Sequence, residues 1–157
     1  MKLTAKAVVF PALIIIAFVI APRIAIRLIP AGIEKMIRMV FDVNMVISTL
    51  TAVGIVAAAM SFVKNITDSW SPANLLAAIA SELIGLYVFI FFIGLGDVAG
   101  LGVARISIPA GLGATMFWDF KFFVLCQFLI CGLSIVKESL NFYSSRKGRF
   151  TQPAAPG

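Results

Sequence analysis

The residue of this sequence best suited to chemistry is Glu82, a carboxyl inside a long apolar segment. It comes about 8 residues, or ~12 Å, after the start of that segment. A charge at the centre of a bilayer costs about 2.5–3.5 kcal/mol, so the carboxyl must be protonated, paired or hydrated. Two interpretations remain open: a site that takes up a proton or another cation, or a hydrogen-bonded carboxyl that fixes one helix against another.

Two further residues complete this candidate intramembrane polar site. Ser81 directly precedes Glu82, and Gln127 lies near the centre of another apolar segment, where its side chain could accept a hydrogen bond from the carboxyl. A second polar group surrounds a glycine-rich segment and consists of Asp97, Arg105, Asp119 and Lys121. These four residues line a polar path if that segment re-enters the membrane, and they are solvated if it is a surface loop.

The rest of the chain contains no recognisable catalytic set. The absence of histidine excludes His-ligated haem, His-containing zinc sites and His-based triads supplied by this chain. Cys126 and Cys131 are five residues apart, which places them about 140° apart around a helix and poorly for a disulfide. Paired carboxylates and nucleophile–base arrangements are also missing. We therefore predict no catalytic, cofactor or metal site and no enzymatic activity.

The composition indicates a membrane protein. Of the 157 residues, 61% are hydrophobic and 13% are charged, and the mean hydropathy is +1.06. A soluble domain is about 45–50% apolar and about 25% charged, so this chain departs from both values in the direction of lipid. The formal net charge of +6 comes from bases at the edges of apolar segments. Anionic phospholipid headgroups are therefore the expected partner, and nucleic acid is not.

Four apolar segments are expected to span the membrane, at about 7–28, 43–63, 74–95 and 117–136. The apolar run before Pro22 would rise only about 22 Å, short of the ~30 Å hydrocarbon core. The first helix should therefore continue past Pro22, with a kink, to about Leu28. Ser71 and Pro72 suit an N-cap followed by proline at the first helical position, which places the start of the third span.

A shorter segment, 33–41, is predicted to be an amphipathic helix at the membrane interface. Its apolar residues follow a spacing of three and four, from Ile33 to Phe41, while its charged residues take the opposite face. Basic side chains near this end of the spans should contact lipid headgroups. The expected headgroup-contacting residues are Arg23, Arg27, Lys35 and Arg38.

Small residues are expected to mark where the helices pack closely. Gly54 and Ala58 form a small-xxx-small pair in the second span. A stripe with a spacing of four runs along the third span through Ala77, Ser81 and Gly85. Such motifs let helix backbones approach each other, although they are common in any membrane bundle.

The glycine-rich segment 96–116 contains five glycines, which argue against a stable span. A surface loop is favoured over a re-entrant element, because irregular backbone at membrane depth needs protein or water to cover it. The bundle is expected to occupy 1–143. A tail that is first basic and then rich in Pro and Ala is expected to follow over 144–157.

These features predict an all-α integral membrane protein, multi-pass, with about four transmembrane helices and one interfacial helix. Missing catalytic groups, little mass outside the bilayer and small-residue stripes on two spans favour a structural or accessory subunit of a larger membrane complex. Its partners would be other membrane subunits and phospholipids, or further copies of itself. The alternative is a small oligomeric channel or ion-coupled transporter that uses Glu82. A third hypothesis is a membrane-shaping protein built on segment 33–41.

Overall fold

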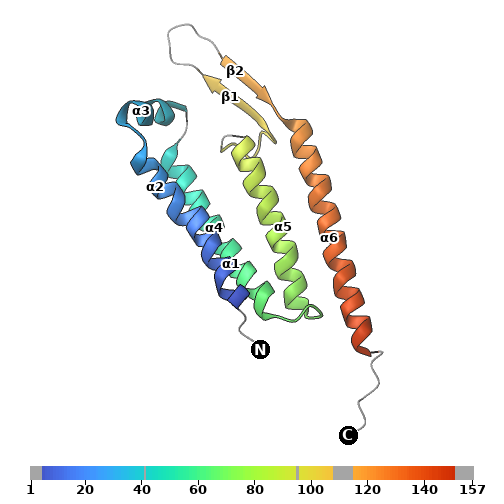
Figure 1. Cartoon of the computed structure of the whole chain (residues 1–157). Helices are drawn as coiled ribbons and strands as arrows, with labels where there is room; N and C mark the ends of the chain where they lie inside the picture. The colour runs from blue at the N-terminus through green and yellow to red at the C-terminus, as the bar shows by residue number, and fades with distance from the viewer. Residues whose placement is uncertain (1–4, 41, 95, 108–114, 151–157) are drawn as a thin grey trace.

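The computed structural model describes residues 5–40, 42–94, 96–107 and 115–150, and most of them are helical (Figure 1). Four helices are long and apolar enough to cross a membrane: Ala5–Leu28, Val43–Ile66, Pro72–Ile93 and Lys121–Gly148. The prediction of four long apolar helices is thereby confirmed. Residue 41 of the predicted interfacial helix, residue 95 of the predicted third span and 151–157 of the predicted tail lie outside the described residues.

The first candidate span consists of three helical pieces: α1 (Ala5–Ile15), a π-helical turn η1 (Ile16–Ile20) and α2 (Ala21–Leu28). Pro22 explains the π-helical turn, because proline has no N–H and its ring clashes with the carbonyl four residues earlier. The N–H of Ala21 donates to the carbonyl of Ile16, five residues back, which is the π-helical pattern. The helix therefore passes the proline by widening one turn.

Side-chain caps define where the following helices begin. After the short helix α3 (Ala31–Val40), Asp42 accepts hydrogen bonds from the backbone N–H groups of Asn44 and Met45 at the start of α4 (Val43–Ile66). Ser71 accepts from the N–H of Ala73 and opens α5 (Pro72–Ile93). Each cap satisfies backbone donors that have no partner inside the helix.

A β-hairpin lies between the third and fourth long helices, and the all-α prediction missed it. Strands β1 (Val103–Ser107) and β2 (Thr115–Asp119) pair antiparallel, with Val103 opposite Asp119 and Ser107 opposite Thr115. Two glycines with positive φ, Gly96 and Gly102, turn the chain before β1. The segment predicted as a loop or a re-entrant element is thus partly a hairpin; residues 108–114 lie outside the described part.

The helix of the predicted fourth span begins later than predicted and continues past Tyr143, the residue to which it was expected to extend beyond the span. Residues 117–119 belong to β2, and Asp119 then accepts a hydrogen bond from the N–H of Lys121, where α6 (Lys121–Phe150) begins. Residues 144–150, predicted as the beginning of a tail, continue this helix. No proline interrupts this stretch, and its basic residues stabilise the carboxyl end of a helix.

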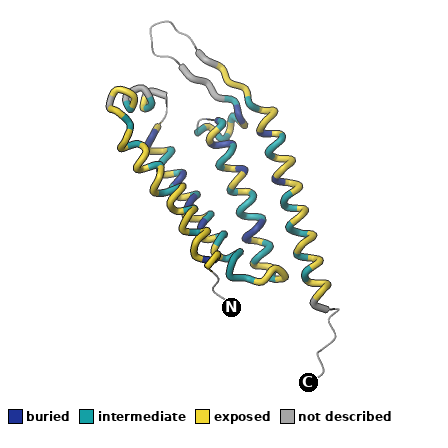
Figure 2. The backbone as a smooth tube through the Cα atoms, in the orientation of Figure 1, coloured by how far each residue is buried: buried dark blue, intermediate teal, exposed yellow. Residues whose placement is uncertain are grey.

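The long helices pack as an open row. Extensive contacts join α1 to α4, α4 to α5 and α5 to α6, and among the described helices α1 makes no such contact with α5 or α6. Figure 2 accordingly shows mostly exposed positions along the first span and α6. The most buried 18-residue stretch belongs to α5, at 28%, whereas that of the first span is 0% buried within the chain. Helix α5 is therefore the centre of the packing.

Candidate functional site

Glu82 lies in the middle of α5, about 15 Å from either end of that helix at the usual rise per residue. Its partner comes from α6, where the hydroxyl of Ser134 donates a hydrogen bond of 2.7 Å to Oε1 of Glu82. Both residues are partly buried. Oε1 can accept this bond whether the carboxyl is protonated or ionised, so the contact does not depend on the charge of Glu82.

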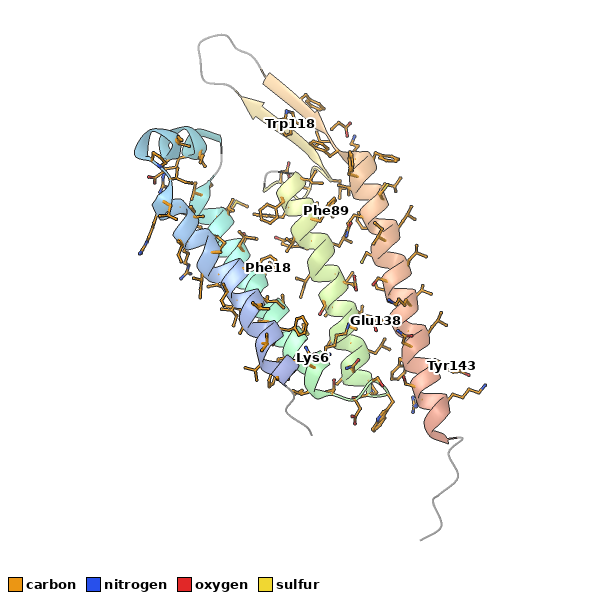
Figure 3. The ribbon with its side chains drawn as sticks, viewed as in Figure 1. Lys6, Phe18, Phe89, Trp118, Glu138 and Tyr143 are labelled. Carbon is orange, nitrogen blue, oxygen red and sulfur yellow. The ribbon has the colours of Figure 1, made fainter. Side chains whose placement is uncertain are left out.

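The bond between Glu82 and Ser134 lies at one end of an apolar cluster that joins α5 to α6. The buried members of the cluster are Leu86, Ile90, Val124 and Cys131, and Phe89, Ile93, Val98 and Ile135 pack against it. Figure 3 labels Phe89 in this region. Leu86 is one turn from Glu82, and Cys131 is one turn from Ser134. The hydrogen bond therefore adds a directional contact to an interface that is otherwise held by apolar packing.

The other two residues of the predicted polar site do not bond to Glu82. The hydroxyl of Ser81 donates to the carbonyl of Ala77 within α5, at 2.8 Å. Gln127 is partly buried on α6, seven residues or about 10 Å along the helix from Ser134. The structure thus brings Glu82 together with Ser134, which the sequence interpretation had not singled out.

A periodic signal for Ser134 is present in the sequence. The polar residues Gln127, Ser134, Glu138, Asn141 and Ser145 recur at intervals of three, four or seven, so they share one face of α6. That face is the one turned toward α5, because it also carries Val124 and Cys131 of the cluster. A polar stripe at helical spacing therefore makes Ser134 a candidate partner from the sequence, together with Gln127.

An ion pair links α4 to α6, which are not neighbours in the row. It joins Lys64, near the end of α4, to Glu138 of the polar stripe on α6. Nζ of Lys64 lies 3.1 Å from Oε1 of Glu138, which Figure 3 labels on α6. Asn74 fixes the neighbouring connection, since its side-chain amide donates to the carbonyls of Lys64 and Thr67. The end of the row next to the 67–71 connection is therefore held by polar contacts.

We expect Lys64→Met to lower the free energy of unfolding by less than about 1 kcal/mol, with a smaller effect in high salt. The reason is exposure: the side chains of Lys64 and Glu138 are 39% and 25% accessible, so solvent screens the pair. Thermal unfolding in detergent at two salt concentrations measures this, and Lys137→Met, next to Glu138 on α6, is the matched control. A salt-independent loss above about 2 kcal/mol would contradict this description of the pair.

The small residues predicted to mediate packing behave differently from one another. Gly54 is buried against η1, where a Cβ on this residue would lie 2.6 Å from Cβ of Phe18, labelled in Figure 3. Ala58 and Ala77 are buried as well. Gly85 is exposed, and nothing lies within 4 Å of the position its Cβ would take. A spacing of four drifts by about 40° per step, so Gly85 has rotated about 80° away from Ala77.

The basic residues predicted to contact headgroups have contacts within the chain as well. Arg38 pairs with Glu34 of the same helix, α3, at 2.8 Å. Nη2 of Arg23 lies 3.5 Å from Oγ1 of Thr51 on α4, and Arg27 is exposed on α2. The side chain of Lys35 lies outside the described part of the structure. Headgroup contact by these residues remains a prediction.

The polar residues around the glycine-rich segment mainly hold turns. Asp97 accepts a hydrogen bond from the N–H of Gly100, and Asp119 accepts one from Lys121. Both carboxylates are exposed, and the side chain of Arg105 is not among the described ones. These residues therefore form no polar path in the described part of the chain.

The described residues also contain no group of three histidine, cysteine, aspartate or glutamate side chains that could hold a metal ion, and Cys126 and Cys131 are both free thiols. No model of a protein family matches the chain, and neither a curated protein nor a solved structure matches it. The function is therefore argued from the arrangement of the helices and from Glu82.

Proposed function

We propose that this chain is a multi-pass membrane protein that serves as a structural subunit of a larger membrane complex and has no catalytic activity of its own. The open row of long helices is the observation that carries this proposal. A transport path or a reaction centre in a helical membrane protein needs an interior lined by several helices. Among the described helices α1 makes no extensive contact with α5 or α6, so the row does not close around a continuous path, and these functions would require helices from other chains.

The outer surface of the row supports the same proposal. Large apolar side chains project from α6 on the sides that do not face α5, and two of them, Phe122 and Leu133, are each 71% exposed. Further exposed apolar residues on this helix are Leu125, Leu129, Ile130, Val136 and Leu140. In a bilayer this surface contacts either lipid or neighbouring helices. It thus offers a second subunit a broad apolar surface without any rearrangement of the row.

The position of Glu82 is also consistent with a structural role. The carboxyl is bonded to Ser134 at the contact between α5 and α6, and the sequence-predicted partners Ser81 and Gln127 do not extend this bond into a chain of polar groups. Proton relays in membranes use series of ionisable or hydroxyl side chains. A single carboxyl–hydroxyl pair joins two helices and conducts nothing by itself.

The second candidate function is a homo-oligomeric channel or ion-coupled transporter that uses Glu82. It is favoured by one observation, the location of this carboxyl halfway along the most buried span. Several rows around a common axis would enclose an interior that one row lacks. In that case Glu82 would have to be reached from this interior, past its bond to Ser134.

Purification in a mild detergent tests the proposal. We expect the chain to be recovered with unrelated hydrophobic chains at a fixed stoichiometry, measured by native mass spectrometry. A photoreactive amino acid at Leu133 should cross-link to one of those chains, whereas one at Ala77, which is buried, should cross-link only within the chain. Recovery as a monomer alone would contradict the proposal, and a pure homo-oligomer would favour the channel.

A further inference from the structure

An apolar cavity of about 260 Å³ lies at the end of the row nearest α3. Four helices contribute to its wall, namely α2, α3, α4 and α5. The lining side chains are Ile26, Ile37, Val43, Val46, Phe91 and Phe92. Val43 opens α4, and the two phenylalanines belong to the last turn of α5, so the cavity lies near the ends of these spans.

The chemistry of the wall selects a hydrocarbon ligand. All six of these side chains are purely aliphatic or aromatic, and a polar group placed among them would lose its hydrogen bonds to water without replacement. Cavities lined in this way stay dry, and one of about 150 Å³ is large enough for benzene. The space found here is larger and partly open, since Phe92 is 52% exposed, so it suits a segment of a longer hydrocarbon chain.

The charges near the cavity indicate the other end of the ligand. Arg23 and Arg27 lie on α2 within one turn of Ile26. Arg38 is already paired with Glu34, whereas no carboxylate among the described residues pairs with Arg23 or Arg27. Two guanidinium groups without a carboxylate partner complement a phosphate, and they add to attraction for anionic lipids at a membrane surface.

We propose that this cavity binds an acyl chain of an anionic phospholipid, whose phosphate lies beside Arg23 and Arg27. Helix α3 contributes Ile37 to the wall of the cavity. The bound lipid would then connect α3 to the ends of α4 and α5 through apolar contacts. This site belongs to the single chain and does not depend on the proposed role as a subunit.

The test uses the chain in nanodiscs that contain a phosphatidylglycerol with a photoactivatable group near the carboxyl end of one acyl chain, because Ile26 of the cavity wall lies within one turn of the arginines. After irradiation, mass spectrometry of peptides should place the label on the segments around Ile37, Val46 and Phe92. Val46→Trp fills part of the cavity and should reduce labelling near Phe92 at least about fivefold. Val56→Trp is the matched control, because Val56 is 46% exposed on the same helix and does not line the cavity.

Several results would overturn the proposal. Labelling of the parent chain that is no stronger at the cavity than at the exposed Phe122 would show lipid contact without a site, and this readout needs no variant. Unchanged labelling in a folded Val46→Trp chain would have the same meaning.

A photoactivatable phosphatidylcholine should label the cavity less than phosphatidylglycerol, and the double change Arg23→Gln with Arg27→Gln should remove that difference. Equal labelling of the parent by both lipids would rule out the anionic headgroup.

Discussion

Replacing Gly54 by alanine is expected to lower the free energy of unfolding by about 1–3 kcal/mol, although alanine is the better helix former. The added Cβ would stand 2.6 Å from Cβ of Phe18 and 3.4 Å from Cγ2 of Val19. The Cβ of Phe18 is bonded directly to the backbone of η1, so it cannot rotate away as the tip of a long side chain could. Helix α4 and the first span must therefore separate to admit one methyl group.

Gly85→Ala is the matched control for Gly54→Ala. It makes the same substitution inside a neighbouring long helix, at a position with nothing within 4 Å of the new Cβ. Without a clash, the change should stabilise the chain by about 0.5–1 kcal/mol. The two variants are thus expected to have opposite signs in detergent unfolding followed by circular dichroism. Equal stability of the two variants would show that the contact between η1 and Gly54 is not tight.

Glu82→Ala is expected to cost about 1–3 kcal/mol, because it leaves the Ser134 hydroxyl without its partner in an apolar surrounding. Glu82→Gln should cost less than about 1 kcal/mol, since the amide oxygen can accept the same hydrogen bond. Ser134→Ala should resemble Glu82→Ala. Its control is Ser139→Ala, which removes a hydroxyl that bonds only to the carbonyl of Ile135 within α6.

The same glutamine variant separates the two candidate functions. A structural carboxyl needs only a hydrogen bond, so Glu82→Gln should preserve both the assembly and any activity of the complex. An ion-coupled transporter needs titration, so the variant would assemble but lose proton- or cation-driven flux in liposomes. We expect the structural outcome. A pH-dependent flux that the parent shows and the glutamine variant lacks would make Glu82 the functional centre.

The long helices were predictable because their signals are local. An apolar run long enough to cross a bilayer identifies a candidate span. Ser71 followed by Pro72 marks the start of α5, because Ser71 caps the helix and the first helical position does not need the N–H that proline lacks. The position of Glu82 along its helix was likewise predictable, by counting residues from the start of the apolar segment. Each of these inferences uses only residues within one segment.

The hairpin could not be predicted in this way because its stability is not local. Glycines before and between the strands indicate irregular backbone, whereas the pairing of Val103 with Asp119 joins residues of two separate segments, 16 positions apart. The aromatic residues Phe117, Trp118 and Phe120 also merge with the apolar run that follows, so the helix was predicted to begin at 117. The start at Lys121 depends on the cap from Asp119.

The partner of Glu82 was missed because the sequence gives the depth of a residue along its own helix but not the axial offset of one helix against another. Gln127 and Ser134 lie on the same face of α6, two turns apart, and both are well inside that helix. Only the offset between α5 and α6 decides which of them meets the carboxyl. That offset follows from the packing of Leu86 and Ile90 against Val124 and Cys131.

The open row also has a consequence for how the chain reaches its native arrangement. Every extensive contact between long helices joins one helix to the long helix made just before it: α4 to α1, α5 to α4 and α6 to α5. Such neighbour-only contacts keep the contact order low, which favours fast folding. Each helix can therefore dock during synthesis onto a surface that already exists. The ion pair between Lys64 and Glu138 is different, because it joins α6 to α4, a helix that is not its neighbour in the row.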